Sequence, residues 1–193
     1  MKPLAIHGGA AGALLWTAVG IWTALELGLA VHTRIAGGAR DRSYLPLSLT
    51  VAGGIALAVF AARRGDLALP GGGWWPVALG IGVLVVGLAL RAWAVLELGR
   101  FFKLTVVVQP DHRVIDTGPY RSIRHPSYTG LLLAMLGVGI ALGTWLSIPA
   151  ALLPPLAGFS IRIRREERVL ARELGEPYRA YMGRTRRLIP GVW

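Results

Sequence analysis

The chain has 193 residues, of which 54% are hydrophobic and only 16% are charged, and its formal net charge is +11. With a mean hydropathy of +0.54, this composition is too apolar for an ordinary soluble domain. The absence of cysteine excludes disulfides, thiolate nucleophiles and cysteine-ligated metals. The four histidines (His7, His32, His112 and His125) lack metal-ligand spacing, so we expect no metal site.

Five apolar segments follow one another along the chain: Ala10–Val31, Pro46–Ala62, Trp74–Leu98, Tyr128–Gly143 and Trp145–Ile161. A transmembrane helix needs about 20 residues, which the first and third segments reach and the other three do not. None of the five has a polar face, and this disfavours a soluble helical bundle. The pattern therefore predicts an all-α integral membrane protein with about five transmembrane helices.

The connections between these segments predict the topology. Only Gly143-Thr144 separates the fourth segment from the fifth, so these two should form a tight helical hairpin. The first segment is longer than the apolar core of a signal peptide, and we interpret it as a retained helix. No internal repeat divides the chain, which indicates a single membrane domain over residues 1–193.

Basic residues predict the orientation in the membrane. With five spans, 17 of the 21 Lys and Arg residues fall on one side. The positive-inside rule then makes the 99–127 loop and the C-terminal tail cytoplasmic. Attraction to anionic lipid headgroups accounts for most of this charge. Nothing in the sequence resembles a nucleic-acid recognition module, so we expect no nucleic-acid partner.

Two cytoplasmic stretches could carry chemistry, Gln109 to Gly130 and Ile161 to Pro190. The predicted hairpin should return Arg124-His125-Pro126 and Arg162–Glu167 to the same membrane face. Pro126 suits the first turn of a helix, where its missing N–H costs nothing. The free N–H groups of that turn favour a polar or anionic ligand atom. Interfacial anchoring is the other interpretation of His125 and Tyr128, and the residues alone leave it open.

The second stretch continues the last apolar segment with charged residues. Arg162 and Glu166 are four apart and share one helical face, where they form either a site or an ordinary ion pair. Glu167 points about 100° away from Glu166, as expected for neighbours on a helix with about 3.6 residues per turn. Beyond it an amphipathic stripe, interrupted by Gly175 and Pro177, should cover the cytoplasmic end of the bundle or lie on the membrane: Leu170, Leu174, Tyr178 and Met182.

Two charges lie within apolar segments, Glu26 in the first and Arg91 in the third. Charged side chains in a membrane are costly and usually face protein or a wet cavity. We expect either that the two pair with each other or that Glu26 lines a lipid access route.

The order of motifs resembles a known family. H-R-V-I-D-T-G-P-Y-R-S-I-R-H-P-S-Y-T-G, then an apolar hairpin, then R-x-x-x-E-E and L-G-E-P-Y-R-A-Y, is similar to the isoprenylcysteine carboxyl methyltransferase family. That family in turn resembles the membrane phospholipid N-methyltransferases. The similarity covers roughly residues 75–190. It implies an N-terminal two-helix part (1–73) and a methyltransferase core (74–193).

The resemblance implies that S-adenosyl-L-methionine is the cofactor and that a lipophilic molecule accepts the methyl group at the cytoplasmic face. The isoprenylcysteine carboxylate is the acceptor usual for the family. Arg162 would hold the acceptor, and Arg162 and Glu166 would be the catalytic pair. The implied cofactor-binding residues are Gln109, His112, Arg113, Val114, Ile115, Tyr120, His125, Pro126, Ser127, Tyr128 and Glu166.

Three alternatives remain open at this stage. Membrane sterol and steroid reductases, which use NADPH, share a similar Arg-His-Pro-x-Tyr element. A phospholipid amine is a further possible methyl acceptor. A non-enzymatic membrane protein is the third alternative, and it would not need the polar cluster around His125 and Glu166.

Overall fold

The computed structural model describes residues 5–6, 9–37, 45–64, 67–103, 111 and 113–191. In this part of the chain it contains six α-helices: α1 (Gly9–Gly37), α2 (Leu45–Arg63), α3 (Trp75–Leu98), α4 (Pro126–Ala141), α5 (Ser147–Glu173) and α6 (Glu176–Arg184). Two short 3₁₀ turns, η1 (Gly99–Phe101) and η2 (Gly118–Arg121), belong to the connection between α3 and α4. The predicted all-helical fold is confirmed for these residues.

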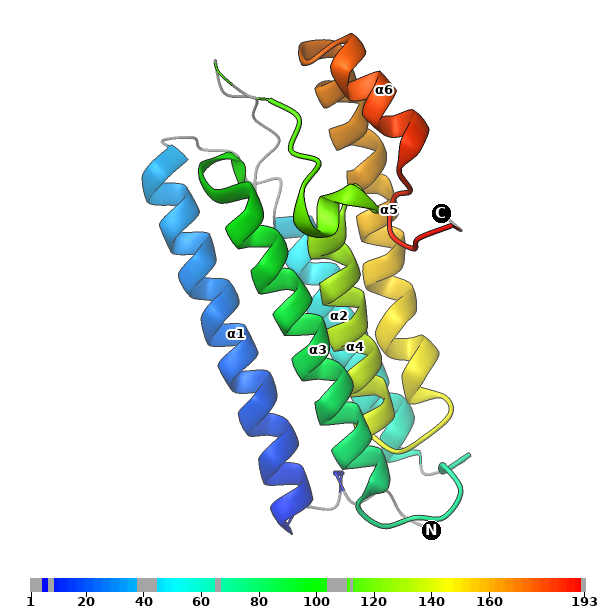
Figure 1. Ribbon diagram of the computed structural model, residues 1–193. Coiled ribbons are helices and arrows are strands. Elements are labelled where there is room, and N and C mark those ends of the chain that lie inside the picture. The colour runs from blue at the N-terminus through cyan, green and yellow to red at the C-terminus, as the bar shows by residue number, and fades with distance from the viewer. Residues whose placement is uncertain are drawn as a thin grey trace.

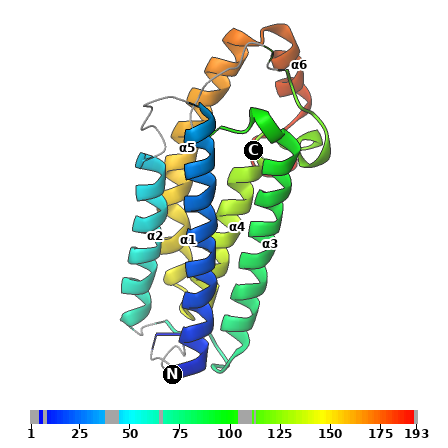
Figure 2. The ribbon, with the colours of Figure 1, turned by 90° about the vertical axis from the view of Figure 1, so that its left-hand side faces the viewer.

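The five long helices run side by side (Figures 1 and 2), and α4 contacts α2, α3 and α5. The end of α1, the start of α2, the end of α3, the start of α4 and the whole of α6 lie at one end of this bundle (Figure 1). The predicted hairpin is present, because α4 and α5 pack against each other with a short turn between them. Residues from distant parts of the sequence therefore meet at the α6 end.

Three helices are long and apolar enough to cross a membrane, at Gly9–His32, Leu45–Arg63 and Trp75–Phe101. The fourth, α4, is apolar but has only 16 residues. Large apolar side chains point outward along the bundle; Leu25 is 62% exposed, Leu49 70% and Leu96 78%. Such surfaces fit lipid and not water, so this chain is a multi-pass membrane protein.

The packing of α3 against α4 depends on glycines. Gly80 lies against Gly137, and Gly87 lies against Gly130, so that the two backbones touch. A Cβ atom at Gly87 would lie only 2.5 Å from the backbone nitrogen of Ala134 and from the carbonyl oxygen of Gly130. Small residues allow helices in a membrane to approach this closely and to gain van der Waals contacts along their length. The start of α4, with its polar residues, is thereby fixed beside the end of α3.

We therefore expect Gly87→Val to destabilise the protein by about 1–3 kcal/mol through overpacking. Gly82→Val is the matched control, because a Cβ atom at Gly82, on the same helix, would meet nothing within 4 Å. Thermal unfolding in detergent checks this expectation. Equal melting temperatures for the two variants would contradict the close α3–α4 contact.

Candidate functional site

The connection that leads from α3 to α4 is held in place by contacts with α3 and with α6. Tyr120 accepts a hydrogen bond at its backbone oxygen from the hydroxyl of Tyr181 in α6, at 2.7 Å. Asp116 pairs with Arg184 at the end of α6, and Thr117 donates a hydrogen bond to Glu97 of α3. The connection is therefore fixed between α3 and α6.

The segment after α6 runs alongside the residues that precede α4. The backbone N–H of Arg124 donates to the carbonyl of Arg186 at 2.7 Å, and that of His125 donates to the carbonyl of Arg187 at 3.0 Å. The N–H of Arg186 donates back to Ser122 at 3.2 Å. These bonds hold the backbone just before α4, so His125 sits at the N-terminal cap of that helix with Pro126 in its first turn.

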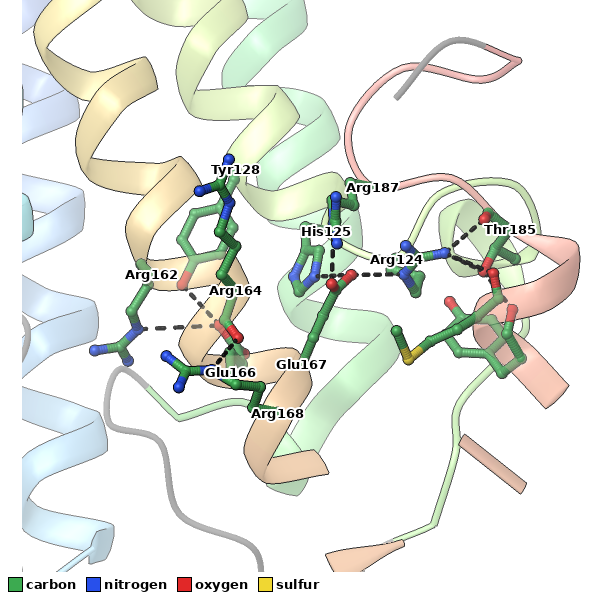
Figure 3. Close-up of polar contacts among 12 residues, drawn as sticks. Arg124, His125, Tyr128, Arg162, Arg164, Glu166, Glu167, Arg168, Thr185 and Arg187 are labelled. Atoms are coloured by element: carbon green, nitrogen blue, oxygen red, sulfur yellow. Dashed lines mark hydrogen bonds and ion pairs between the residues drawn. The ribbon is translucent and has the colours of Figure 1, made fainter. Parts of the chain in front are cut away.

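The carboxylate of Glu167 lies at the centre of the polar cluster (Figure 3). Its Oε1 accepts a hydrogen bond from Nε of Arg124 at 2.8 Å and lies 3.4 Å from Nε2 of His125. Its Oε2 accepts from Nε of Arg187 at 2.9 Å. Glu167 is only 3% exposed. This set of Glu167, Arg124, His125 and Arg187, here called the Glu167 cluster, joins α5, the start of α4 and the C-terminal segment.

The electrostatics of this cluster favour the ionised carboxylate. Glu167 belongs to the charged half of α5, beyond the apolar stretch that ends at Ile161. Burial alone would raise its pKa, but hydrogen bonds from His125, Arg124 and Arg187 outweigh burial and lower the pKa to about 2. The carboxylate therefore stays charged at every physiological pH.

Arg124 has a second set of partners at the end of α6. Its Nη1 donates to the carbonyls of Met182 at 3.1 Å and Thr185 at 2.5 Å. Carbonyls at a helix C-terminus lack partners within the helix and carry partial negative charge, so a guanidinium there stabilises the helix end. One arginine thus fixes α6 to α5 and to the start of α4.

A cavity of about 130 Å³ lies beside this cluster. Eight of the twelve residues that the sequence predicted for the site line it: Arg113, Val114, Ile115, Tyr120, His125, Ser127, Tyr128 and Glu166. The rest of the lining is largely apolar, with Leu47, Leu98, Phe101, Phe102 and Leu131 among its members. A polar rim and an apolar wall therefore enclose one space, a combination typical of small-molecule sites.

Two described residues of the predicted set, Pro126 and Arg162, do not line this cavity. Gln109 and His112 lie outside the described residues. Pro126 is buried in the first turn of α4 and shapes that helix start. Arg162 is 8% exposed and lies one helical turn from Glu166, with its Nε 4.0 Å from Oε2 of Glu166.

Glu166 faces different partners from its neighbour Glu167, as Figure 3 shows. The hydroxyl of Tyr128 donates to its Oε2 at 3.1 Å. The ring of Tyr128 stacks between those of His125 and Phe159, with centroids 5.7 Å and 5.1 Å away. Tyr128 is thereby held rigidly and can fix the orientation of the Glu166 carboxylate at the cavity wall.

Sequence reasoning missed several residues at this end of the bundle. Glu167 and Arg187 were not predicted as partners. One signal was available, because a carboxylate that points into the protein interior needs cations or hydrogen-bond donors nearby. The stripe after Glu167 was predicted either to cover the bundle end or to lie on the membrane, and three of its residues, Leu170, Leu174 and Tyr178, line the cavity at the bundle end. Burial and the nearby Glu166 raise the pKa of Tyr120, so its hydroxyl stays protonated at neutral pH.

The fold and the cavity define a class, namely helical membrane proteins with a cavity of mixed polar and apolar lining at one end of the bundle. Residues 79–172 match the sequence model of the isoprenylcysteine carboxyl methyltransferase (ICMT) family. The resemblance predicted from the motifs is therefore confirmed as a match to this family over the segment from α3 to α5.

Individual proteins agree with this match. Protein-S-isoprenylcysteine O-methyltransferase B of Arabidopsis thaliana is 30% identical over 121 residues, which are 62% of this chain and 61% of that protein. Protein-S-isoprenylcysteine O-methyltransferase of Schizosaccharomyces pombe is 34% identical over 103 residues, which are 52% of this chain and 44% of that protein.

A solved structure, that of the eukaryotic intramembrane Ras methyltransferase ICMT, shares the fold. Its TM-score is 0.60 at 21% identity, and the match covers 91% of this chain and 66% of that one. This chain thus spans less than two thirds of the length of each of these three proteins.

The Glu167 cluster makes a prediction about pH. The lowered pKa of Glu167 means that its contribution to stability is complete above about pH 4.5 and is lost as the pH falls towards 2. Glu167→Gln should destabilise the protein by about 3 kcal/mol at pH 7, because it also leaves buried cations without a counter-ion. The difference in stability between the wild type and the variant should become smaller at pH 3. Thermal unfolding in detergent at both pH values measures this difference.

The matched control is Glu176→Gln, which removes an exposed carboxylate from α6. It should change stability by less than about 0.5 kcal/mol. If Glu167→Gln behaved like this control at pH 7, the cluster would not hold the bundle end together.

Proposed function

We propose that this protein is an S-adenosyl-L-methionine-dependent methyltransferase with a lipophilic acceptor, for which the carboxylate of an isoprenylcysteine or a similar isoprenoid lipid is the first candidate. The observation that carries the proposal is the cavity, in which eight motif residues converge beside an apolar wall. The ICMT-family match of residues 79–172 and the names of the relatives support the same activity.

The residues that line the cavity suit this cofactor. Carboxylate, hydroxyl and imidazole groups at the rim (Glu166, Tyr128 and His125) can bind its amino acid and ribose parts. Gln109 and His112 complete the proposed binding set, and Pro126 would support it by fixing the start of α4. When bound, the cofactor supplies an electrophilic methyl group on a sulfonium.

The chain itself would contribute alignment and desolvation. A carboxylate acceptor is already a nucleophile at neutral pH, so no general base is required. Arg162 would hold this carboxylate with two parallel hydrogen bonds, which a lysine could not match. Glu166 accepts a hydrogen bond from Tyr128 at its Oε2, which also lies near Arg162. It would bind the cofactor and orient it towards the acceptor. Closely aligned reactants in a site that excludes water account for a large part of the rate in such reactions.

The proposal includes an arrangement in the membrane. We infer five spans, with the apolar half of α5 as the fifth and with the α6 end in the cytoplasm. The basic residues of the charged half of α5 and of the tail support this orientation through the positive-inside rule. Residues 1–73 form an N-terminal two-helix part of one membrane domain, and residues 74–193 form the methyltransferase core. A water-borne cofactor and a membrane-borne acceptor would then reach the cavity from different phases.

The first experiment is calorimetric binding of S-adenosylhomocysteine, and separately of NADPH, to the detergent-purified protein. We expect micromolar binding of S-adenosylhomocysteine and none of NADPH. Glu166→Ala should weaken that binding at least about tenfold, since a hydrogen bond to a charged group contributes about 1.5–3 kcal/mol. Glu176→Ala, on the exposed face of α6, is the control. Binding of NADPH alone would assign the protein to the reductases and defeat the proposal.

Arg162 makes a separate prediction. Arg162→Ala should lower the turnover of an S-prenylated cysteine by a hundredfold or so, through loss of a charge-assisted contact, and leave the affinity for S-adenosylhomocysteine within about twofold. Radiometric methyl transfer and calorimetry measure the two quantities. Arg165→Ala, an exposed arginine of the same helix, should retain activity. A large loss of cofactor affinity in Arg162→Ala would refute this division of roles.

A further inference from the structure

One wall of the cavity carries a positive charge from within the membrane part of α3. Arg91 lines the cavity and is only 6% exposed. Its Nη1 donates a hydrogen bond to Oγ of Ser127, in the first turn of α4, at 2.5 Å. Its Cζ lies 6.0 Å from the centre of the Phe102 ring, which lines the same cavity. Arg91 therefore forms part of the cavity wall, with its guanidinium close to Ser127 and Phe102, which line the same cavity.

The counter-ion of Arg91 comes from α1. Oε2 of Glu26 accepts a hydrogen bond from Nη2 of Arg91 at 2.6 Å, and Oε1 accepts a second one from Nε. The indole N–H of Trp22, one turn earlier on α1, lies 3.4 Å from the same Oε1. Of the two expectations for these charges, the pairing of Glu26 with Arg91 is confirmed. It is a fork-shaped contact of the strongest kind that arginine makes.

The other basic residues that line the cavity differ from Arg91. Arg124 and His125 face Glu167, Arg113 is exposed to solvent and Lys103 is partly exposed. Among the described residues that line the cavity, Arg91 is the buried cation whose counter-ion comes from a helix outside the segment that matches the ICMT family, since α1 ends well before residue 79.

The physical consequence concerns the charge of the ligand. In a site of low dielectric constant a buried guanidinium without a counter-ion repels another cation strongly. The proposed cofactor carries a sulfonium, whereas its product, S-adenosylhomocysteine, carries a neutral thioether. The two molecules otherwise have the same shape and the same polar groups, apart from one methyl group. A change in wall charge should therefore separate their affinities.

We propose that Glu26 is the counter-ion that neutralises Arg91, so that the cavity accepts a cationic sulfonium. The proposal rests on the proposed function and adds a residue of α1 to the site. Glu26 acts through Arg91 and is a positioning and neutralising residue, not a catalytic one. If the pair served only to attach α1 to α3, its loss would weaken both ligands alike.

The experiment measures the dissociation constants of S-adenosylmethionine and S-adenosylhomocysteine by calorimetry on the same detergent-purified proteins. Glu26→Gln keeps the shape and removes the charge. It should raise the ratio of the two constants, S-adenosylmethionine over S-adenosylhomocysteine, on the order of tenfold, the size expected for two like unit charges in one site at an effective dielectric constant of about 20. Glu173→Gln, an exposed carboxylate of α5, is the control and should leave the ratio unchanged.

The reverse substitution has the opposite sign. Arg91→Gln leaves the Glu26 carboxylate at the wall and should lower the ratio. The double variant Glu26→Gln/Arg91→Gln buries no unpaired charge, so it is expected to fold even if a single variant does not, and its ratio should equal that of the wild type. An unchanged ratio in a folded single variant, or an altered ratio in the double variant, would overturn the proposal. Failure of the wild type to bind either ligand would instead defeat the proposed function.

Discussion

A buried carboxylate is tolerated only where cations and hydrogen-bond donors surround it, and in this protein those partners come from two separate parts of the chain. Glu167 on α5 faces Arg124 and His125 before α4, and Arg187 after α6. Removing any one partner leaves charge in a place where water cannot compensate it. The cavity depends on this arrangement, because His125 lines its wall and Arg124 fixes α6 beside it. The site is thus held by electrostatics at its rim, and the bundle below is held by close packing of backbones.

That division follows from the two surroundings. Within the apolar part, hydrophobic burial cannot drive helices together, because lipid is as apolar as a side chain; close contact through Gly80, Gly87, Gly130 and Gly137 takes its place. At the α6 end, charged groups can be solvated or paired, so ion pairs and hydrogen bonds can hold the structure together there. The ion pair of Glu26 and Arg91 joins these two parts of the structure. Arg91 lines the cavity, whereas Glu26 lies on α1, many of whose other side chains are exposed.

Sequence reasoning could reach the helices and most of the cavity, since both follow from local patterns. Apolar runs located the five long helices, and Pro126 marked the start of α4. It could not reach the Glu167 cluster. Glu166 and Glu167 are neighbours on one helix and differ only in the direction in which their side chains point. Which of them meets Arg187 depends on the path of the chain after Gly175, and the sequence does not reveal that path. The glycine contacts were missed for a related reason, because a glycine in an apolar run reveals nothing until its facing helix is known. Gln109 and His112 lie outside the described residues, so their roles in the site stay predictions.

The backbone pairing of Arg124 and His125 with Arg186 and Arg187 has a consequence for biosynthesis. Arg124 and its acceptor Thr185 stand 61 positions apart, so the ribosome must add the whole α4–α5 hairpin and α6 before the residues ahead of α4 acquire their partners. The transmembrane helices can enter the bilayer one after another, each satisfied by its own backbone bonds. Residues 185–188 lie beside the start of α4 through these bonds, so this end of the bundle gains its full set of contacts only after they have been synthesised. Insertion of the helices therefore precedes the final ordering of the segment before α4.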